Sequence, residues 1–158
     1  MAIGVPGIVT HLCFDKEAVE AANLYVSVFP GSKIDRLDRV KGTPSGDCDI
    51  VAFTLAGKPF MAISGGPTFK FNEAISLLVP CDTQEEIDHY WSGLAADPAA
   101  GRCGWIKDRF GLSWQIWPKA LGEMMASPDG AARGRATAAM MASKKFDIAE
   151  LRRAFAGP

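Results

Sequence analysis

Two polar side chains interrupt apolar, strand-like stretches of the chain and are the first candidates for chemistry. His11 lies in IVTHLCF, and Gln115 lies in SWQIWP, between two tryptophans and an isoleucine. An imidazole with a pKa of about 6.5 can act as a general base or bind a metal. A carboxamide cannot take up a proton, but it can bind a metal or form hydrogen bonds. Each residue therefore indicates either a polar pocket or a hydrogen bond inside a core.

The elements that must position these residues form a pattern that occurs twice. An apolar stretch at residues 8–14 ends at Asp15, which we expect to cap a helix over residues 18–29, because a carboxylate accepts the N–H groups of a first turn. Residues 74–81 end in the same way at Asp82. IVTHLCFD aligns with ISLLVPCD without a gap, which predicts a duplicated β-α unit.

Strand and helix patterns follow each of these units. Thr83 and Glu86 are a candidate capping box at the start of the second helix. Strand patterns occupy residues 33–40, 49–56 and 59–64 in the first half, and 104–107 and 112–117 in the second. The second half is shorter, so we expect it to lack one strand or loop. Helical patterns at residues 120–126, 129–143 and 147–155 close the chain.

Composition and charge limit the kinds of partner that we expect for this chain. The chain has 158 residues, a net charge of -1 and no basic stripe, which argues against nucleic acid as a partner. Its four cysteines form no C-x-x-C pair and no basic, apolar leader opens the sequence, so we expect reduced thiols in a cytoplasmic protein. No apolar stretch reaches the length of a membrane span, so we expect no membrane partner either.

Four stretches carry a resemblance to a known family: THLCFDKEAVEAANLYVSVFPGSKI, GKPFMAISGGPTFKFNEAISLLVPCDTQEEIDHYW, CGWIKDRFGLSWQIWP and KKFDIAELRRA. The chain resembles the PhnB-like group, often labelled 3-demethylubiquinone-9 3-methyltransferase, of the glyoxalase/bleomycin-resistance (vicinal oxygen chelate) superfamily. The resemblance implies an α+β fold in which tandem βαβββ modules form curved, mostly antiparallel half-barrel sheets, with a helical C-terminal tail. We expect one glyoxalase-like domain over residues 1–158, with modules at about 5–64 and 72–118, helices at about 119–156, and a homodimer.

Many members of the superfamily bind a divalent metal between such sheets through His, Gln or Glu on the first and last strands of each module. Strand alternation places Leu12, Phe14, Trp114 and Ile116 toward the helices, which leaves His11 and Gln115 facing inward at matching positions. The same alternation predicts a ligand pocket formed by His11, Cys13, Phe60, Ser76, Gln115 and Trp117. Trp105 is another aromatic candidate for this wall, although core packing explains it better.

The other two ligand positions do not hold metal-binding residues. Alternation directs Phe60, Ala62 and Ser64 inward in one strand, and Ser76 and Leu78 in the other. Two neutral ligands alone offset little of the desolvation of a divalent ion, so a metal on His11 and Gln115 is disfavoured and the cofactor is unknown. His11 stays the candidate catalytic base, or a hydrogen-bonded pocket residue.

Three functions remain open. The first is an enzyme with lyase, isomerase or dioxygenase-type superfamily chemistry on a small molecule. The second is a non-catalytic protein that binds or sequesters a small molecule in the same pocket. The third is the methyl transfer of the family label, which is disfavoured because no G-x-G-x-G sequence for S-adenosylmethionine is present.

Overall fold

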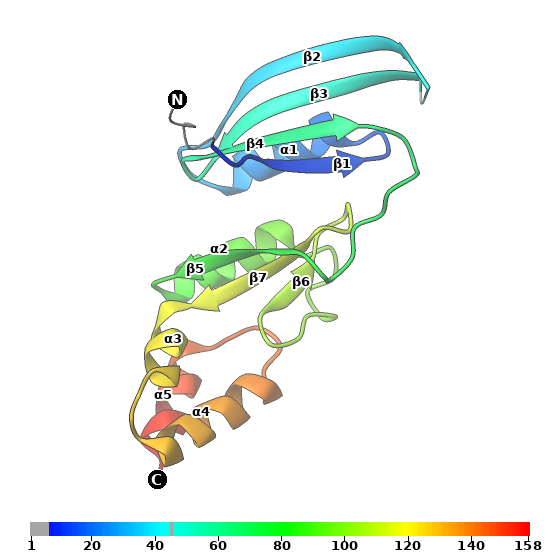
Figure 1. Cartoon of the computed structure of the whole chain (residues 1–158). Helices are drawn as coiled ribbons and strands as arrows, with labels where there is room; N and C mark the ends of the chain where they lie inside the picture. The colour runs from blue at the N-terminus through cyan, green and yellow to red at the C-terminus, as the bar shows by residue number, and fades with distance from the viewer. Residues whose placement is uncertain (1–6, 45) are drawn as a thin grey trace, which may run out of the picture. The chain divides into compact units, whose positions relative to one another are not determined.

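A computed structural model of the chain describes residues 7–44 and 46–158, which separate into two compact units. The first unit ends at Lys70, and the second runs from Phe71 to Pro158. Both units combine strands with helices, as expected for an α+β fold (Figure 1). The division falls in the segment between the two predicted modules. That the whole chain forms one domain stays a prediction.

The first unit has the predicted order of one strand, one helix and three strands. Its elements are β1 (Thr10–Phe14), α1 (Ala18–Val28), β2 (Lys33–Thr43), β3 (Gly46–Leu55) and β4 (Lys58–Ser64). The strands lie in the order β1-β4-β3-β2. Strands β1 and β4 are parallel, whereas the other neighbours are antiparallel. The first and last strands of the module are therefore adjacent in one sheet.

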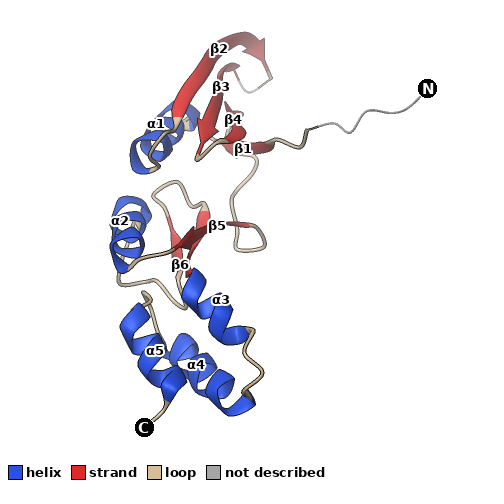
Figure 2. Cartoon of the chain, turned by 90° about the vertical axis from the view of Figure 1, so that its left-hand side faces the viewer, coloured by secondary structure: helices blue, strands red, loops and turns tan. Residues whose placement is uncertain are grey.

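Helix α1 lies on one side of this sheet (Figure 2) and packs on it through small and aromatic side chains. Its buried residues are Ala18, Ala21, Ala22, Tyr25 and Val28. The alanines keep the helix close to the strands, and the Tyr25 ring lies 6.4 Å from the Phe53 ring of β3. Leu12 and Phe14 of β1 are buried with them. Their alternation with His11 and Cys13 is the pattern of a strand with one covered face.

The start of α1 differs from the expectation. Its N-cap residue is Glu17, whose side chain makes no capping hydrogen bond. The N–H of Ala18 instead donates to the hydroxyl of Ser64 on β4, at 3.3 Å. The predicted Asp15 cap is wrong, because Glu17 is the N-cap residue and the Ala18 N–H, which a cap at Asp15 could have bound, donates to Ser64.

The second unit has the same β-α beginning but one strand fewer, as the shorter sequence indicated. Its elements are β5 (Ser76–Cys81), α2 (Gln84–Leu94), β6 (Trp105–Lys107), β7 (Ser113–Pro118), α3 (Lys119–Met125), α4 (Gly130–Ala142) and α5 (Ile148–Ala156). The strand order is β5-β7-β6, with β5 and β7 parallel and β6 and β7 antiparallel. The predicted capping box is confirmed, since the Glu86 N–H donates to Thr83 Oγ1 at 3.2 Å and the Thr83 N–H donates to the Glu86 carboxylate.

The three C-terminal helices confirm the predicted helical tail and pack within the second unit. Asp129 caps α4 and Asp147 caps α5, each through a carboxylate that accepts N–H groups of the first turn. The side chain of Gln84 on α2 donates to the Phe146 carbonyl at 3.1 Å and accepts from the Ile148 N–H at 3.0 Å. Helix α5 is thereby attached to the beginning of α2.

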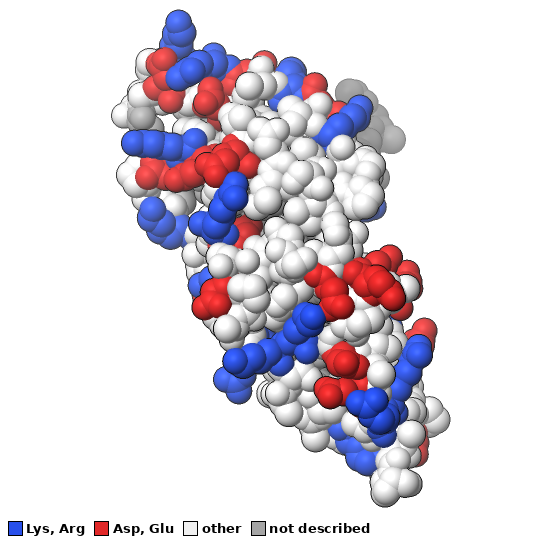
Figure 3. Space-filling model, turned by 180° about the vertical axis from the view of Figure 1, so that it is seen from behind, with Lys and Arg blue, Asp and Glu red and all other residues white. Residues whose placement is uncertain are grey.

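Charges of both signs are mixed on the face of the described residues that Figure 3 draws. On the face drawn in Figure 3, basic and acidic side chains lie next to one another. Exposed ion pairs such as Arg36 with Asp38 and Lys145 with Asp88 follow the same pattern. Among the helices of the described residues, none is both long and apolar enough to cross a membrane.

Candidate functional site

His11 and Cys13 lie on the face of β1 opposite α1. Leu12 is 6% and Phe14 is 3% exposed against the helix, whereas His11 is exposed and Cys13 is half-buried. This is the facing that alternation predicted for β1.

The neighbouring strand β4 has the opposite facing from the prediction. Ala62 is fully buried beside Leu12 in the register of the parallel pair, and Ser64 bonds to the start of α1. The Phe60 ring stacks on Phe53 at 5.4 Å, within the cluster that includes Tyr25. Phe60 therefore lies on the α1 side of the sheet, and its assignment to the same face as His11 is wrong.

Met61 and Ile63 take the positions that Phe60, Ala62 and Ser64 were expected to occupy. Met61 is in register with His11, and neighbours in register project to the same face. A thioether and an alkyl side chain offer a divalent ion no carboxylate or imidazole. The corrected facing therefore still provides no further ligand for a hard or borderline metal on this sheet.

In the second unit, Gln115 forms a hydrogen-bonded pair with Ser76. Trp114 and Ile116 are each 1% exposed, while Gln115 between them is half-buried on the face away from α2. Its Nε2 donates to the Ser76 hydroxyl on the adjacent strand β5 at 2.7 Å. Leu78 of β5 is in register with Gln115 and is 51% exposed. The amide in this apolar strand is thus explained by a polar partner on the same sheet.

Two tryptophans flank this pair in different ways. Trp105 on β6 is in register with Gln115 and is half-buried, which places an aromatic ring beside the amide. Trp117 instead meets the edge of the Phe146 ring at 6.0 Å, so the tail covers part of it. Phe146, which precedes α5 and is 1% exposed, was missed in the sequence because it stands outside any periodic apolar pattern.

Two titratable groups of the second unit have pKa values that their surroundings shift. The ammonium of Lys107 lies 2.5 Å from the carboxylate of Glu73, and this hydrogen bond holds the pKa of Glu73 below its ordinary value. Burial, reinforced by the nearby Glu86 and Asp82, raises the pKa of Cys81 to about 12. A thiol with that pKa stays protonated at neutral pH and is no nucleophile.

The described residues contain no ready-made metal centre. Within residues 7–44 and 46–158, no group of three or more His, Cys, Asp or Glu side chains could hold an ion. All four cysteines are described, and none of them forms a disulfide. Whether His11 and Gln115 act together stays a prediction.

Comparison with known proteins gives the family. The profile of the family described as 3-demethylubiquinone-9 3-methyltransferase matches residues 6–117. The PhnB protein of Bacillus cereus, provisionally given the same methyltransferase description, is 34% identical to the chain. The similarity covers 72% of this chain and 99% of that protein, with a TM-score of 0.61.

A second solved structure supports the fold alone. Protein PA1353 from Pseudomonas aeruginosa is 18% identical, and the match covers 72% of this chain and 98% of that protein with a TM-score of 0.56. No protein of curated function matches the chain. The profile match over most of the sequence and the 34% identity decide the assignment. The chain belongs to the PhnB-like family that carries the label 3-demethylubiquinone-9 3-methyltransferase.

Proposed function

We propose that this PhnB-like chain is a glyoxalase-like (vicinal oxygen chelate) superfamily protein that binds a small, oxygen-bearing organic molecule. The observation that carries the proposal is the Gln115–Ser76 pair beside Trp105, on the face of the second sheet away from α2. Because the Gln115 amide N–H group donates to the serine, its carbonyl oxygen can accept from a ligand, and the Ser76 hydroxyl can donate to one. An aromatic ring next to such groups suits a planar ligand.

The same proposal gives His11 the role of catalytic base. Its imidazole is exposed on β1, and an imidazole side chain can accept and donate protons in general acid–base catalysis. A proton acceptor and an amide that binds an oxygen would suit the lyase, isomerase or dioxygenase-type reactions of the superfamily. A divalent metal on His11 and Gln115 stays disfavoured, because neither β4 nor β5 adds a carboxylate or imidazole.

A non-catalytic binding or sequestering protein is the alternative. It uses the same Gln115–Ser76 pair and needs no base, so it predicts that His11 is dispensable. Methyl transfer is the third candidate and is supported only by the family label. We also propose a homodimer in the cytoplasm, and light scattering of the purified chain tests the dimer.

Titration with catechol, an aromatic probe with two neighbouring oxygens, tests the proposed function. In amide-resolved NMR spectra, catechol should shift the Gln115 side-chain amide and the backbone signals of β5 and β7. Gln115→Leu, which keeps the side-chain size, should weaken binding about fivefold or more, since it removes a hydrogen bond. Ser92→Ala, which removes an exposed hydroxyl on α2, should not change it.

The same titrations separate the alternatives. Catechol shifts confined to other parts of the chain, or equal binding by Gln115→Leu, would overturn the proposal. Turnover of a bound ligand that His11→Ala abolishes favours the enzyme, whereas binding without turnover favours the sequestering protein. Heat released on addition of S-adenosylmethionine would support methyl transfer instead.

A further inference from the structure

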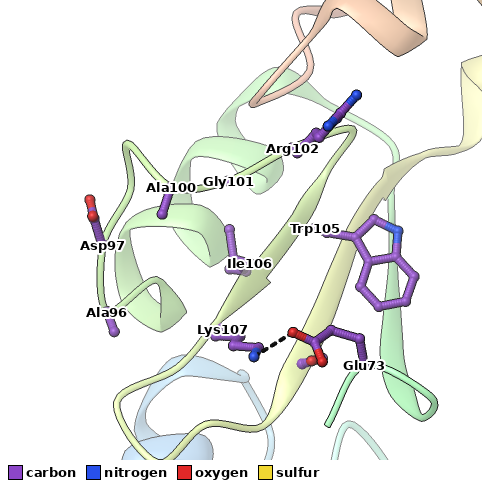
Figure 4. A pocket seen from close by; sticks show the side chains of 10 residues that line it. Glu73, Ala96, Asp97, Ala100, Gly101, Arg102, Trp105, Ile106 and Lys107 are labelled. Atoms are coloured by element: carbon purple, nitrogen blue, oxygen red, sulfur yellow. Dashed lines mark ion pairs between the residues drawn. The ribbon is translucent and has the colours of Figure 1, made fainter.

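A pocket with a volume of about 270 Å³ lies along β6 in the second unit. Its lining includes Ala100, Gly101, Trp105, Ile106, Lys107 and Ser113 (Figure 4). Gln115 and Ser76 do not line it, although Ser113 precedes Gln115 by two positions on β7. The pocket therefore lies beside the polar pair of the proposed function and shares Trp105 with it, since Ser113 is in register with Ser76 and Trp105 with Gln115.

The wall opposite β6 is a loop that is held in place at both ends. The Ala96 N–H donates to the Lys107 carbonyl at 2.9 Å, and Arg102 and Trp105 exchange two backbone hydrogen bonds at 3.1 and 2.9 Å. Gly101 lies so close to Trp91 of α2 that a Cβ atom there would be 2.4 Å from its ring. The loop therefore packs on the core, and the pocket is already present in the chain without a ligand.

The charged groups around the pocket balance one another. Lys107 and Glu73 both line the pocket and form an ion pair, which the dashed line in Figure 4 marks. Asp97 and Arg102 add one charge of each sign to the lining. With two positive and two negative groups, and the remaining side chains mostly apolar, the pocket favours a neutral ligand over an ion.

One polar group in this lining has no partner. Ser113 is 1% exposed, and its Oγ forms no hydrogen bond with any described residue. A buried hydroxyl normally finds a partner, because its desolvation is otherwise uncompensated. The Oγ atom has almost no accessible surface, so an oxygen of a ligand completes this hydrogen bond only if the Ser113 side chain rotates toward the pocket.

We propose that this pocket binds a small, neutral, mostly apolar molecule through one hydroxyl or carbonyl group that bonds to Ser113. The apolar part packs against Trp105, and the single oxygen meets the Ser113 hydroxyl on the same face of the sheet. An engineered cavity of about 150 Å³ takes benzene, so this pocket has room for a substituted ring. The proposal shares Trp105 with the proposed function but needs neither His11 nor Gln115, and the dependence on Ser113 distinguishes the two.

Phenol and toluene, which have nearly the same shape and differ in one hydroxyl, test the proposal on the full chain. In NMR titrations of the wild type, phenol should shift the amide signals of Gly101, Trp105 and Ser113. It should bind about fivefold more tightly than toluene, as expected for one neutral hydrogen bond. Ser113→Ala should remove this preference while leaving toluene affinity unchanged.

Ser92→Ala serves as the control, because it removes a hydroxyl outside the pocket and should keep the preference for phenol. Phenol shifts that avoid the pocket, or an equal preference for phenol in Ser113→Ala, would overturn the proposal. The mapping on the wild type needs no variant, so an altered fold in Ser113→Ala would not remove the test. If neither phenol nor toluene gave a saturable shift, the pocket would hold only water and the proposal would be wrong.

Discussion

At the scale of single residues, Asp108 organises the turn between β6 and β7. It is 2% exposed, and its carboxylate accepts from the Phe110 N–H at 2.9 Å and the Leu112 N–H at 3.1 Å. Its other oxygen accepts from the Trp114 Nε1–H at 2.9 Å. One acid therefore fixes both the backbone of the turn and the buried Trp114 side chain of β7. Hydrogen bonds to a charged acceptor such as this carboxylate are stronger than hydrogen bonds between neutral groups.

Replacing Asp108 with Asn should lower the free energy of unfolding by about 2 kcal/mol. The new amide can still accept through its oxygen, but its NH₂ group meets the Trp114 N–H as a second donor. Urea denaturation measures the change. Asp97→Asn is the matched control, because Asp97 accepts from the Ala99 N–H in an exposed turn and the new amide oxygen can do the same. Equal losses in both variants would show that the contact with Trp114 is unimportant.

Cys81 gives a prediction that depends on pH. Burial of its fully covered side chain, with smaller effects of Glu86 and Asp82, raises its pKa to about 12, above the ordinary thiol value of 9.0. The folded state therefore binds the proton more tightly than the unfolded state does. This thiol contributes no pH dependence below the unfolded pKa, and stability falls as the pH rises from about 9 toward 12.

Alkylation tests the burial of Cys81 that raises this pKa. At pH 8 we expect iodoacetamide to modify half-buried Cys13 and Cys103 while Cys81 stays unmodified in the folded chain. Denaturant should remove the difference, because it arises from burial. Mass spectrometry of the resulting peptides gives the answer. Early labelling of Cys81 in the native protein would mean that β5 opens readily.

At the scale of elements, the junction between β6 and the tail depends on Gly104. Its φ of +77° favours glycine, and a Cβ atom there would lie 2.8 Å from the Ile116 carbonyl oxygen and 2.4 Å from the Phe146 ring. The Gly104 N–H also donates to the Lys144 carbonyl at 2.9 Å. Strand β6 and the segment before α5 can therefore approach one another only because this position has no side chain.

Gly104→Ala and Gly111→Ala form a matched pair that isolates this close approach. Gly111 has a similar φ of +86° but no heavy atom within 4 Å of the Cβ position. The alanine at position 111 should cost about 1 kcal/mol, the ordinary penalty of the left-handed conformation. The alanine at position 104 should cost at least about 2 kcal/mol more, because Phe146 and the backbone must move. Thermal unfolding of both variants checks this, and similar melting temperatures would contradict it.

At the scale of the whole molecule, the family profile and the C-terminal helices occupy different parts of the chain. The family match ends at residue 117, and α3 begins at Lys119. The three C-terminal helices therefore lie outside the residues matched by the family profile, although KKFDIAELRRA in this part carries a resemblance to the family. They are part of the second unit, where Phe146 packs on Trp117.

The division into two units predicts where proteases act. The segment between β4 and β5 includes Phe69, which is 69% exposed, and the exposed Lys70 next to it. Limited digestion with trypsin should cut first after Lys70, because exposed loop segments are preferred cleavage sites. Fragments ending at residue 70 and beginning at residue 71 should appear in the mass spectrum. A Lys70→Gln variant should slow this cut, and earlier cuts inside either unit would contradict the division.

The sequence alone predicted most of the elements of this fold. Its alternation gave the facing of β1 and β7, its capping box gave the start of α2, and its spacing gave the shorter second sheet. These features are local, because each depends on residues within one or two turns or on the period of a single strand. The position of Gln115 on the face opposite Trp114 belongs to the same group.

Tertiary structure decided what local pattern could not. In β4 the run from Phe60 to Ile63 is apolar on both faces, so its periodicity cannot select the buried face, and only the pairing with β1 places Ala62 beside Leu12. The donors that Asp108 satisfies and the unpartnered hydroxyl of Ser113 also depend on distant neighbours. Hydrogen bonding and burial are sums over contacts in space, and a strand pattern records only which residue types are available to make them.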